Sequence, residues 1–284
     1  MALSLQARAL HFVFKIGDRP ATVKFYKEVL GMRTLRHEEF AEGCEAACNG
    51  PYANRWSKTM IGYGPEDTHF VIELTYNYGV KSYDLGNDFL GITIKSHEVI
   101  ERAKNMKWPM EEKDGKIILK APGGYIYNII NEPQSSSDPV QKVTLACSNL
   151  QKTISYWNGI LGMKIIHQQG KSVTLAFNDK HCHLEFVDIG KPVDHAKAYG
   201  RIAFAVPKES LPTIQKKIED TNHKVLTPLI SLDTPGKATV TVVILADPDG
   251  HEICFVDEEG FRELSQVDEN SDKELTRFLN KDKS

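Results

Sequence analysis

The stretch His69-Phe-Val-Ile-Glu-Leu-Thr-Tyr-Asn-Tyr-Gly79 carries the clearest fold signal in this sequence. Its residues alternate between two faces of an extended strand, and Glu73 lies in the middle of the face that starts at His69 and ends at Asn77. The opposite face is apolar or aromatic. A carboxylate in such a strand needs an arginine or lysine, a metal ion or a substrate proton as a partner, because burying its charge alone is costly. The alternative is a salt-bridged or half-exposed glutamate on a sheet edge.

The residues before this stretch predict a strand, a helix and two further strands. The first strand covers Ala9–Ile16. Pro20 suits the first turn of a helix, apolar residues follow at helical spacing, and Gly31 ends the helix. Two β-type runs, Arg33–Phe40 and Thr59–Tyr63, complete the order strand, helix, strand, strand, strand.

A second unit of the same kind is predicted from Asp88 to Ile130. Its elements are expected at Phe89–Ile94 (strand), Glu98–Met106 (helix), Ile117–Lys120 (strand) and Tyr125–Ile130 (strand). Residues 132–139 have the composition of a linker and almost no apolar side chains, so we expect a domain boundary near Ser136.

The pattern then returns in the second half of the chain. Ser155–Met163 resembles Lys24–Met32, and His183–Val187 resembles Val71–Thr75, so that Glu185 corresponds to Glu73. Later landmarks continue the match: Tyr199–Val206 corresponds to the strand around Gly91, and Asp247–Gly250 to the turn Ala121–Gly124. The repeat predicts domains at 5–132 and 140–257, a linker at 133–139 and a C-terminal helical tail at 258–284 that docks on the body.

Composition excludes several classes of function. The chain has 284 residues, with 35 basic and 38 acidic side chains, and it has no basic stripe. It therefore has no signature of nucleic-acid or membrane-surface binding, and no apolar run is long enough to span a bilayer. Five cysteines without C-x-x-C spacing are expected to be reduced thiols in an intracellular protein, with neither a disulfide nor a zinc site. A cytoplasmic location is expected, and a short mitochondrial presequence at the N-terminus remains an alternative.

The sequence resembles the glyoxalase I-like family of the vicinal oxygen chelate (VOC) superfamily over roughly residues 8–256. The matching phrases are Phe25-Tyr-x-x-Val-Leu-Gly-Met32, Glu73-Leu-Thr-Tyr-Asn-Tyr-Gly79, Tyr83-Asp-Leu-Gly86 and Asp247-Pro-Asp-Gly250. The resemblance implies an α+β fold of four βαβββ modules in two tandem domains of the glyoxalase/bleomycin-resistance type. The strands of such modules curl into two incomplete barrels, and each barrel mouth can hold a divalent metal.

The resemblance also implies a reaction. Glyoxalase I isomerises the glutathione hemithioacetal of methylglyoxal to lactoylglutathione, which detoxifies the aldehyde. A metal ion stabilises charge on the enediolate oxygens as a Lewis acid, and a carboxylate moves the proton between neighbouring carbons. Imidazole and carboxylate ligands with open positions suit zinc or nickel.

The ligand positions implied by the resemblance are only partly filled. One mouth is expected to hold His11, Glu73, Arg201 and Cys254, and the other Gly91, Asn128, Lys142 and Glu185. His11 and Glu73 are the candidate metal ligands, and Glu73 is the candidate base, because Cys254 replaces the usual glutamate. Arg201 is expected to pair with Glu73, although an open mouth with a Cys254 thiolate ligand is the alternative, and Glu252 on the same strand face is a substitute base. Lys142 is expected to neutralise Glu185 and to leave the second mouth free of metal.

Substrate-binding candidates surround the first mouth. Asn77 matches a family asparagine that contacts glutathione, and Lys15 and Lys197 stand near positions where relatives use arginine. Lys237 lies in the loop Thr234–Ala238, which resembles a closing loop. For each lysine, a solvated surface charge is the alternative. The loop 43–52 is a candidate lid.

Two functions remain open on the sequence. The first is a glyoxalase I-like enzyme that uses glutathione as co-substrate and has a partly degenerate metal site. The second is a catalytically silent VOC module that binds a small anionic ligand or a protein partner.

Overall fold

The computed structural model of the chain describes residues 2–134, 138–234 and 237–281, and it contains four successive βαβββ modules. The first module consists of β1 (Arg8–Ile16), α1 (Arg19–Lys24), the π-helical turn η1 (Phe25–Val29), β2 (Arg33–Phe40), β3 (Trp56–Gly62) and β4 (Val71–Asn77). The second consists of β5 (Phe89–Lys95), α2 (His97–Asn105), β6 (Met110–Lys113), β7 (Lys116–Lys120) and β8 (Ile126–Ile130).

The second half of the chain repeats this order. The third module consists of β9 (Val140–Cys147), α3 (Leu150–Trp157), β10 (Lys164–Gln169), β11 (Ser172–Ala176) and β12 (His183–Asp188). The fourth consists of β13 (Arg201–Val206), the 3₁₀ turn η2 (Lys208–Ser210), α4 (Leu211–Asp220), β14 (Lys224–Asp233), β15 (Thr239–Ala246) and β16 (Glu252–Asp257). Helices α5 (Glu258–Leu264) and α6 (Ser271–Lys281) follow.

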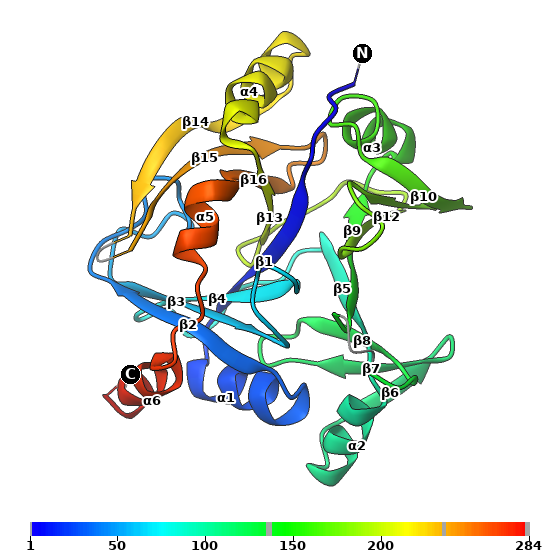
Figure 1. Ribbon diagram of the computed structural model, residues 1–284. Coiled ribbons are helices and arrows are strands. Elements are labelled where there is room, and N and C mark those ends of the chain that lie inside the picture. The colour runs from blue at the N-terminus through cyan, green and yellow to red at the C-terminus, as the bar shows by residue number, and fades with distance from the viewer. Residues whose placement is uncertain (1, 135–137, 235–236, 282–284) are drawn as a thin grey trace.

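The modules combine across the sequence into two eight-stranded sheets. One sheet has the order β14-β15-β16-β13-β1-β4-β3-β2, and the other has the order β10-β11-β12-β9-β5-β8-β7-β6. The first module thus joins the fourth through antiparallel β1 and β13, and the second joins the third through β5 and β9. Figure 1 shows α1, α2, α3, α4 and α6 at the periphery of these two sheets, whereas α5 packs on β13, β15 and β16. The expected α+β fold of VOC type is confirmed, whereas the domain boundaries remain predictions, and residues 135–137 of the linker lie outside the described ranges.

Strand β4 is buried along its whole length. Its apolar residues Ile72 and Leu74 pack in the same core cluster as Phe25 and Tyr26 of η1. The opposite face of β4 carries Glu73, and this side chain lines an internal cavity. A one-residue slip of register would exchange these faces, so the apolar pattern of β4 determines the direction of the Glu73 side chain.

Strand β6 was not expected from the sequence. Its residues Met110–Lys113 are all exposed and show no apolar alternation. It forms a hairpin with β7 through Asp114 and Gly115, which both have positive φ (51° and 71°). An Asp-Gly pair favours such a two-residue turn, so this local signal was present in the sequence.

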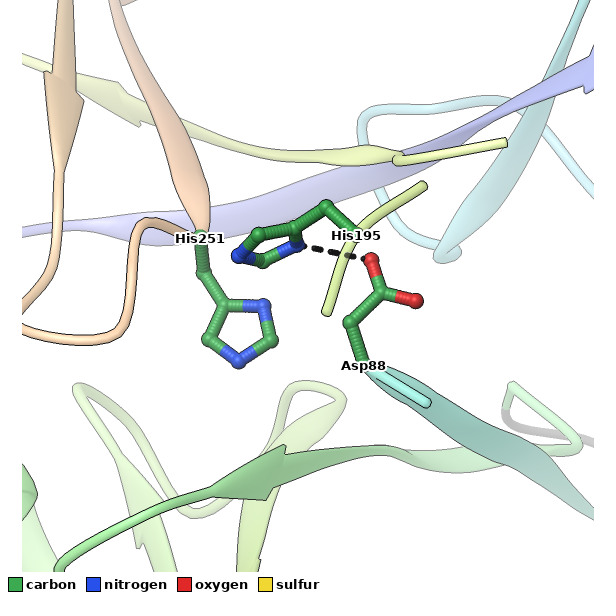
Figure 2. Close-up of side chains that lie close together, drawn as sticks. All are labelled: Asp88, His195 and His251. Atoms are coloured by element: carbon green, nitrogen blue, oxygen red, sulfur yellow. Dashed lines mark hydrogen bonds and ion pairs between the residues drawn. The ribbon is translucent and has the colours of Figure 1, made fainter. Parts of the chain in front are cut away.

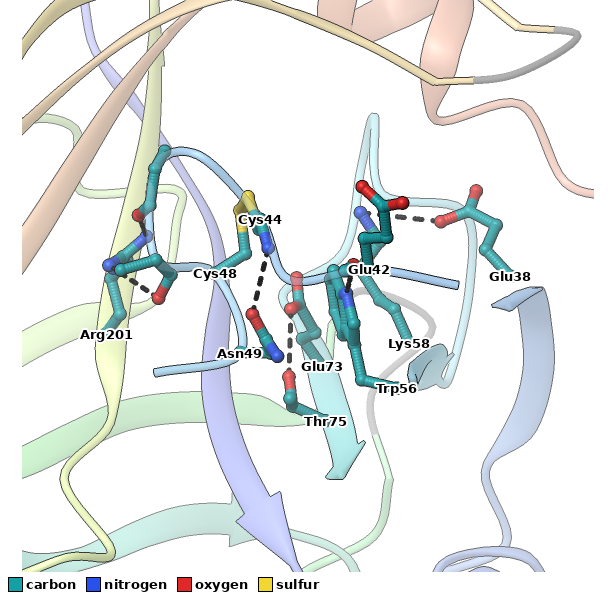
Figure 3. The surroundings of a disulfide bond; sticks show 12 residues. Glu38, Glu42, Cys44, Cys48, Asn49, Trp56, Lys58, Glu73, Thr75 and Arg201 are labelled. Atoms are coloured by element: carbon teal, nitrogen blue, oxygen red, sulfur yellow. Dashed lines mark hydrogen bonds and ion pairs between the residues drawn. A yellow bond between two sulfur atoms is a disulfide. The ribbon is translucent and has the colours of Figure 1, made fainter. Parts of the chain in front are cut away.

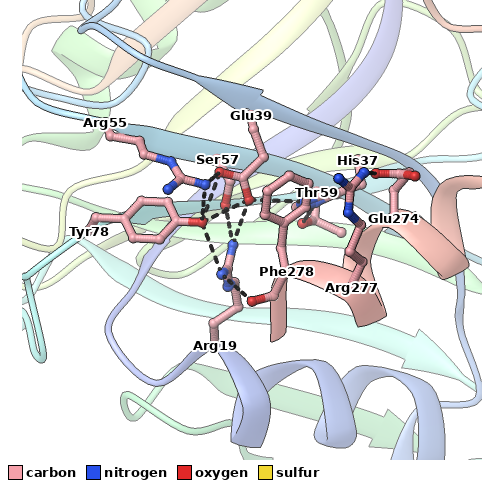
Figure 4. A network of polar contacts seen from close by, with 10 residues as sticks. All are labelled: Arg19, His37, Glu39, Arg55, Ser57, Thr59, Tyr78, Glu274, Arg277 and Phe278. Carbon is pink, nitrogen blue, oxygen red and sulfur yellow. Dashed lines mark hydrogen bonds and ion pairs between the residues drawn. The ribbon is translucent and has the colours of Figure 1, made fainter. Parts of the chain in front are cut away.

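The C-terminal helix α6 packs on β2 through a network of charged and aromatic side chains (Figure 4). Glu39 is at its centre and accepts hydrogen bonds from Arg19 (3.0 Å), Arg55 (2.9 Å) and the hydroxyl of Tyr78 (2.8 Å). Arg19 also donates to the backbone carbonyl of Phe278 in α6 (3.4 Å). The expected docking of the tail therefore depends on a polar network as well as on apolar contacts.

Across the described ranges, we find no helix that combines the length and the apolar character needed to cross a bilayer.

We expect Glu39→Gln to lower the free energy of unfolding by about 1–3 kcal/mol, because it removes the charge that compensates the buried guanidinium of Arg19. The matched control is Glu274→Gln, since Glu274 pairs only with Arg277 among the described residues and both are on the exposed face of α6. Urea unfolding monitored by circular dichroism measures both variants. Equal stability of the two variants would contradict a central role for Glu39.

Candidate functional site

The first barrel mouth is formed by the four central strands β4, β1, β13 and β16. In their register Val13 is opposite both Glu73 and Arg201, and Ala203 is opposite both His11 and Cys254. The four side chains His11, Glu73, Arg201 and Cys254 consequently line one inner cavity of about 90 Å³. This is the grouping that the resemblance implied.

His11 and Glu73 face each other inside this cavity. The distance between His11 Nε2 and Glu73 Oε2 is 3.5 Å. His11 Nδ1 lies 2.5 Å from Oε1 of Glu66, a buried residue that also pairs with Arg36 at 3.3 Å. A carboxylate on the far nitrogen orients the ring and fixes which nitrogen faces the cavity. Glu66 was missed from the sequence because it lies in the turn before β4, outside any strand pattern.

Glu73 is only 6% exposed and is held by its neighbour on the same strand face. The Thr75 hydroxyl donates to Glu73 Oε1 at 3.2 Å. The other carboxylate oxygen, Glu73 Oε2, points toward His11 and the cavity. The carboxylate is therefore positioned with one oxygen available to a small molecule.

Arg201 does not pair with Glu73, so the expected salt bridge across the mouth is wrong. Its guanidinium pairs with Glu252 at 2.7 Å and donates to the backbone carbonyls of Ala46 (3.0 Å) and Ala47 (3.3 Å). The reason is the register of the parallel strands β13 and β16, which places Arg201 opposite Glu252. The same ion pair engages the carboxylate of Glu252, which the sequence indicated as a substitute base.

Cys254 is a partly buried free thiol in the same cavity. Burial raises the pKa of its thiol to about 12, and the nearby positive charge of Arg201 only partly offsets this effect. The thiol is therefore neutral at physiological pH unless a bound cation deprotonates it. The first mouth thus offers two ligands, His11 and Glu73, beside a guanidinium and a neutral thiol.

The loop 43–52 covers this mouth, as Figure 3 shows. Cys44 and Cys48 in the loop form a disulfide with a sulfur–sulfur distance of 2.13 Å, so the expectation that all five cysteines are reduced is wrong for this pair. A turn in which Ala47 N donates to Cys44 O (2.8 Å) brings the two Cα atoms to 5.4 Å. Cys147, Cys182 and Cys254 are free thiols.

Asn77, the candidate glutathione contact, holds the loop in place. Its side chain accepts a hydrogen bond from Asn49 Nδ2 (2.9 Å) and donates to Asn49 O (3.1 Å) and to the Tyr83 hydroxyl (3.0 Å). Asn77 is 2% exposed. In this conformation the side-chain amide of Asn77 forms its hydrogen bonds with Asn49 and Tyr83 of the same chain.

An outer pocket of about 340 Å³ adjoins the inner cavity. Both spaces are lined by Cys48, Lys58, Leu232, Val240 and Leu264, so they form one continuous cleft. This volume is within the usual range of small-molecule sites, about 300–1,000 Å³. The charged groups on the outer lining are the ammonium of Lys58 and the carboxylates of Glu42, Glu45 and Asp233.

The lysines proposed for substrate binding lie in different environments. Lys237 pairs with Glu38 at 2.9 Å and so fastens its loop to β2, and residues 235–236 of that loop are outside the described ranges. Lys197 is exposed. Lys15 is only 4% exposed, which makes the surface-charge alternative wrong for it, and its ammonium donates to Tyr199 O (2.6 Å) and lies 3.4 Å from the Tyr199 ring centroid.

The second mouth is closed by an ion pair. Lys142 Nζ lies 2.7 Å from Glu185 Oε1, as expected, and the Thr144 hydroxyl donates to Oε2 at 2.9 Å. The side chain of Asn128 lies over Gly91, where a Cβ atom would approach Asn128 Nδ2 to 2.5 Å. Glu185 is thus neutralised by the protein.

Comparison with known proteins agrees with this geometry. Residues 8–114 match the Glyoxalase/Bleomycin resistance protein/Dioxygenase superfamily, and residues 149–264 match the family Glyoxalase domain-containing protein 4-like, C-terminal domain. The chain is 55% identical over 280 residues to "Glyoxalase domain-containing protein 4" of Mus musculus, which covers 98% of this chain and 94% of the relative. The chain belongs to the glyoxalase domain-containing protein 4 family.

Other relatives of this chain are named as enzymes. It is 45% identical to "Glyoxalase 1" of Caenorhabditis elegans, with 99% of both chains covered. It is 30% identical to "Probable lactoylglutathione lyase, chloroplastic" of Arabidopsis thaliana, with 88% of this chain and 73% of the relative covered. The crystal structure of glyoxalase I from Zea mays superposes with a TM-score of 0.74 at 24% identity, covers 96% of each chain, and supports the fold alone.

The buried ammonium of Lys15 predicts a pH-dependent stability. Burial lowers the pKa of Lys15 to about 8, so between pH 8 and the ordinary lysine pKa the unfolded chain binds more protons than the folded chain. The free energy of unfolding therefore rises with pH in this window. We expect Lys15→Met to remove about 1–2 kcal/mol of this rise between pH 8 and 9.5.

Denaturant unfolding at several pH values measures this contribution as the difference between wild type and variant. Lys197→Met, at an exposed lysine, is the control and should keep the wild-type pH dependence. A Lys15→Met protein that retains the full rise would show that Lys15 is charged in the folded state throughout this range.

Proposed function

We propose that this chain is a glyoxalase I-like isomerase, with Glu73 as the residue that transfers the proton. The substrate is the hemithioacetal of a 2-oxoaldehyde and glutathione. The observation that carries the proposal is the Glu73 carboxylate inside a small cavity of about 90 Å³, 3.5 Å from His11. The names of relatives such as "Glyoxalase 1" support the same reaction class.

The reaction moves one proton between adjacent carbons, and Glu73 suits both transfers. Its carboxylate takes the proton from the carbon that bears sulfur and returns it to the former carbonyl carbon, so the base is regenerated. Thr75 holds the other carboxylate oxygen at 3.2 Å and fixes the direction of attack. Apolar walls at Val13, Val242 and Phe261 limit the entry of water during the transfer.

A four-ligand metal shell does not fit the residues of this mouth. His11 Nε2 and Glu73 are suitable ligands, but the guanidinium of Arg201 carries a positive charge and Cys254 is a neutral thiol. Lys58 borders both the inner cavity and the outer pocket, and its ammonium, 3.4 Å from Glu38 Oε2, is the group we assign to the negative oxygens of the enediolate. Positive charge placed in advance where negative charge develops lowers the barrier.

The outer pocket would receive the thiol part of the substrate. Its carboxylates Glu42, Glu45 and Asp233 suit the amino end of glutathione better than its carboxylate ends. The loop 43–52 covers the bound substrate in this arrangement. Its hydrogen bonds to Arg201 and Asn77 hold it closed, and these contacts must break for it to open.

A binding module is the second candidate function. The Arg201–Glu252 pair favours it, because it places a compensated guanidinium at one of the positions where the resemblance implies a metal ligand. The same cleft would then hold a small ligand without chemical change. Activity measurements separate the two functions.

We expect Glu73→Gln to lower kcat/KM for the glutathione hemithioacetal of methylglyoxal by about 10²–10⁴-fold, because it removes the base. Formation of the thioester is followed by absorbance, with and without added zinc or nickel. Glu185→Gln is the matched control at the equivalent strand position of the other sheet, and it should retain the wild-type rate. Equal rates for wild type and Glu73→Gln would place the chemistry elsewhere.

The binding module makes a different prediction for a restoring variant. If the natural mouth serves only binding, the wild type is inactive and the double change Arg201→His with Cys254→Glu creates metal-dependent activity. If the natural mouth is catalytic, the wild type is active without this change. An inactive wild type that still binds glutathione adducts by calorimetry would support the binding function.

A further inference from the structure

Three side chains from distant segments converge where the two sheets meet (Figure 2). Asp88 precedes β5, His195 lies between β12 and β13, and His251 precedes β16. One ligand atom from each lies within 4.8 Å of the others. Asp88 and His251 are 8% and 5% exposed, and none of the three lines the cleft of the first mouth.

The hydrogen bonds of His195 leave a position for a cation. His195 Nε2 lies 2.8 Å from the carbonyl oxygen of Asp249, which only accepts, so Nε2 carries a hydrogen. His195 Nδ1 lies 2.9 Å from Asp88 Oδ2. A neutral ring would direct its Nδ1 lone pair at the carboxylate, so this contact requires a positive species between the two atoms: a proton or a metal ion.

In His251 the hydrogen is likewise on Nε2. Its Nε2 lies 2.7 Å from the carbonyl oxygen of Ala146 and must carry the hydrogen. The lone pair of the neutral ring is then on Nδ1, and Figure 2 shows the nitrogen next to Cγ facing Asp88 and His195. Histidines that bind metals commonly donate their outer N–H to a carbonyl or carboxylate, as both rings do here.

We propose that Asp88, His195 and His251 bind a divalent transition metal such as zinc, at a site separate from both barrel mouths. Two imidazoles and one carboxylate are a donor set that zinc and its neighbours accept, with a water in the remaining position. In a tetrahedral site, two ligand atoms at about 2.1 Å from an ion are about 3.4 Å apart, and His195 Nδ1 and Asp88 Oδ2 are 2.9 Å apart. Binding draws His251 Nδ1 inward to complete the set.

The backbone around the triad is held in place without a metal. Asn87 N donates to Asp194 O at 2.8 Å, and the two segments approach so closely that a Cβ atom on Gly86 would lie 1.8 Å from Asp194 O. On the other side, Asp247 Oδ1 accepts from the backbone N–H of both Asp249 and His251. Ligands on such a braced scaffold lose little freedom on binding, which favours affinity.

The position of the site indicates its role. Asp88 immediately precedes β5, in the sheet of the second and third modules, and His251 immediately precedes β16, in the sheet of the first and fourth. A metal bound to both would cross-link the two sheets. Because the ligands come together only in the folded chain, binding stabilises the folded state.

Zinc calorimetry on the metal-stripped full-length protein tests the proposal. We expect one site in wild type, weakened at least about tenfold in His251→Gln and in Asp88→Asn. The side-chain amide introduced by His251→Gln is a donor that can replace His251 Nε2 opposite Ala146 O. His11→Ala removes the candidate ligand of the first mouth and should bind zinc at this site as wild type does.

Two further measurements make the result decisive. Zinc should raise the melting temperature of wild type and His11→Ala but not of His251→Gln, and a zinc-soaked crystal should show anomalous density between the three side chains. Zinc binding that disappears in His11→Ala and persists in His251→Gln would place the metal in the barrel mouth and overturn the proposal. Absence of zinc binding in wild type would overturn it as well and leave a proton-bridged ion pair.

Discussion

The antiparallel pairing of β1 with β13 is the constraint on which the rest of the site depends. It joins modules that are almost 200 residues apart in the chain and covers two strand edges that would otherwise be open. Its register sets Val13 opposite Arg201, while the parallel neighbours carry Glu73 and Glu252. A cavity with residues from both ends of the chain follows directly from this pairing.

Charge inside this sheet is organised as a chain of compensated pairs. Glu73 faces His11, His11 contacts Glu66, Glu66 pairs with Arg36, and Arg36 pairs with Glu38. Burial alone would raise the pKa of Glu38, but the cations Lys58, Arg36 and Lys237 lower it to about 2. The carboxylate therefore remains charged, and the network connects the inner cavity to the loop that bears Lys237. Each of these three buried glutamates has a basic partner, which is the condition for keeping so many carboxylates in a core.

The two sheets share one architecture and differ in what their mouths contain. In one, the glutamate of β4 lines a cavity, whereas in the other the corresponding Glu185 of β12 is neutralised by Lys142. The proposed metal triad lies at neither mouth but where the sheets meet. The duplicated fold thus provides three chemically distinct environments, and the equivalent strand position has different chemistry in each half.

The sequence by itself determined the modules and the central pair of the site. Alternation in the Glu73 strand, the repeated Leu-Gly-Met phrase and the Asp-Pro-Asp-Gly turn are local patterns that predict the repeated modules, and the family resemblance carried by these phrases implied the α+β fold and the meeting of His11 with Glu73. Tertiary structure alone decided the partners of these residues. Four contacts depend on register and on how loops close. They are Glu66 with His11, Glu252 with Arg201, Tyr199 with Lys15, and the disulfide between Cys44 and Cys48. The same is true of the Asp88, His195 and His251 cluster, whose members share no sequence spacing. Local periodicity reports which face of an element is apolar, but the pairing of a polar side chain is a contact between distant segments, and only the folded chain specifies it.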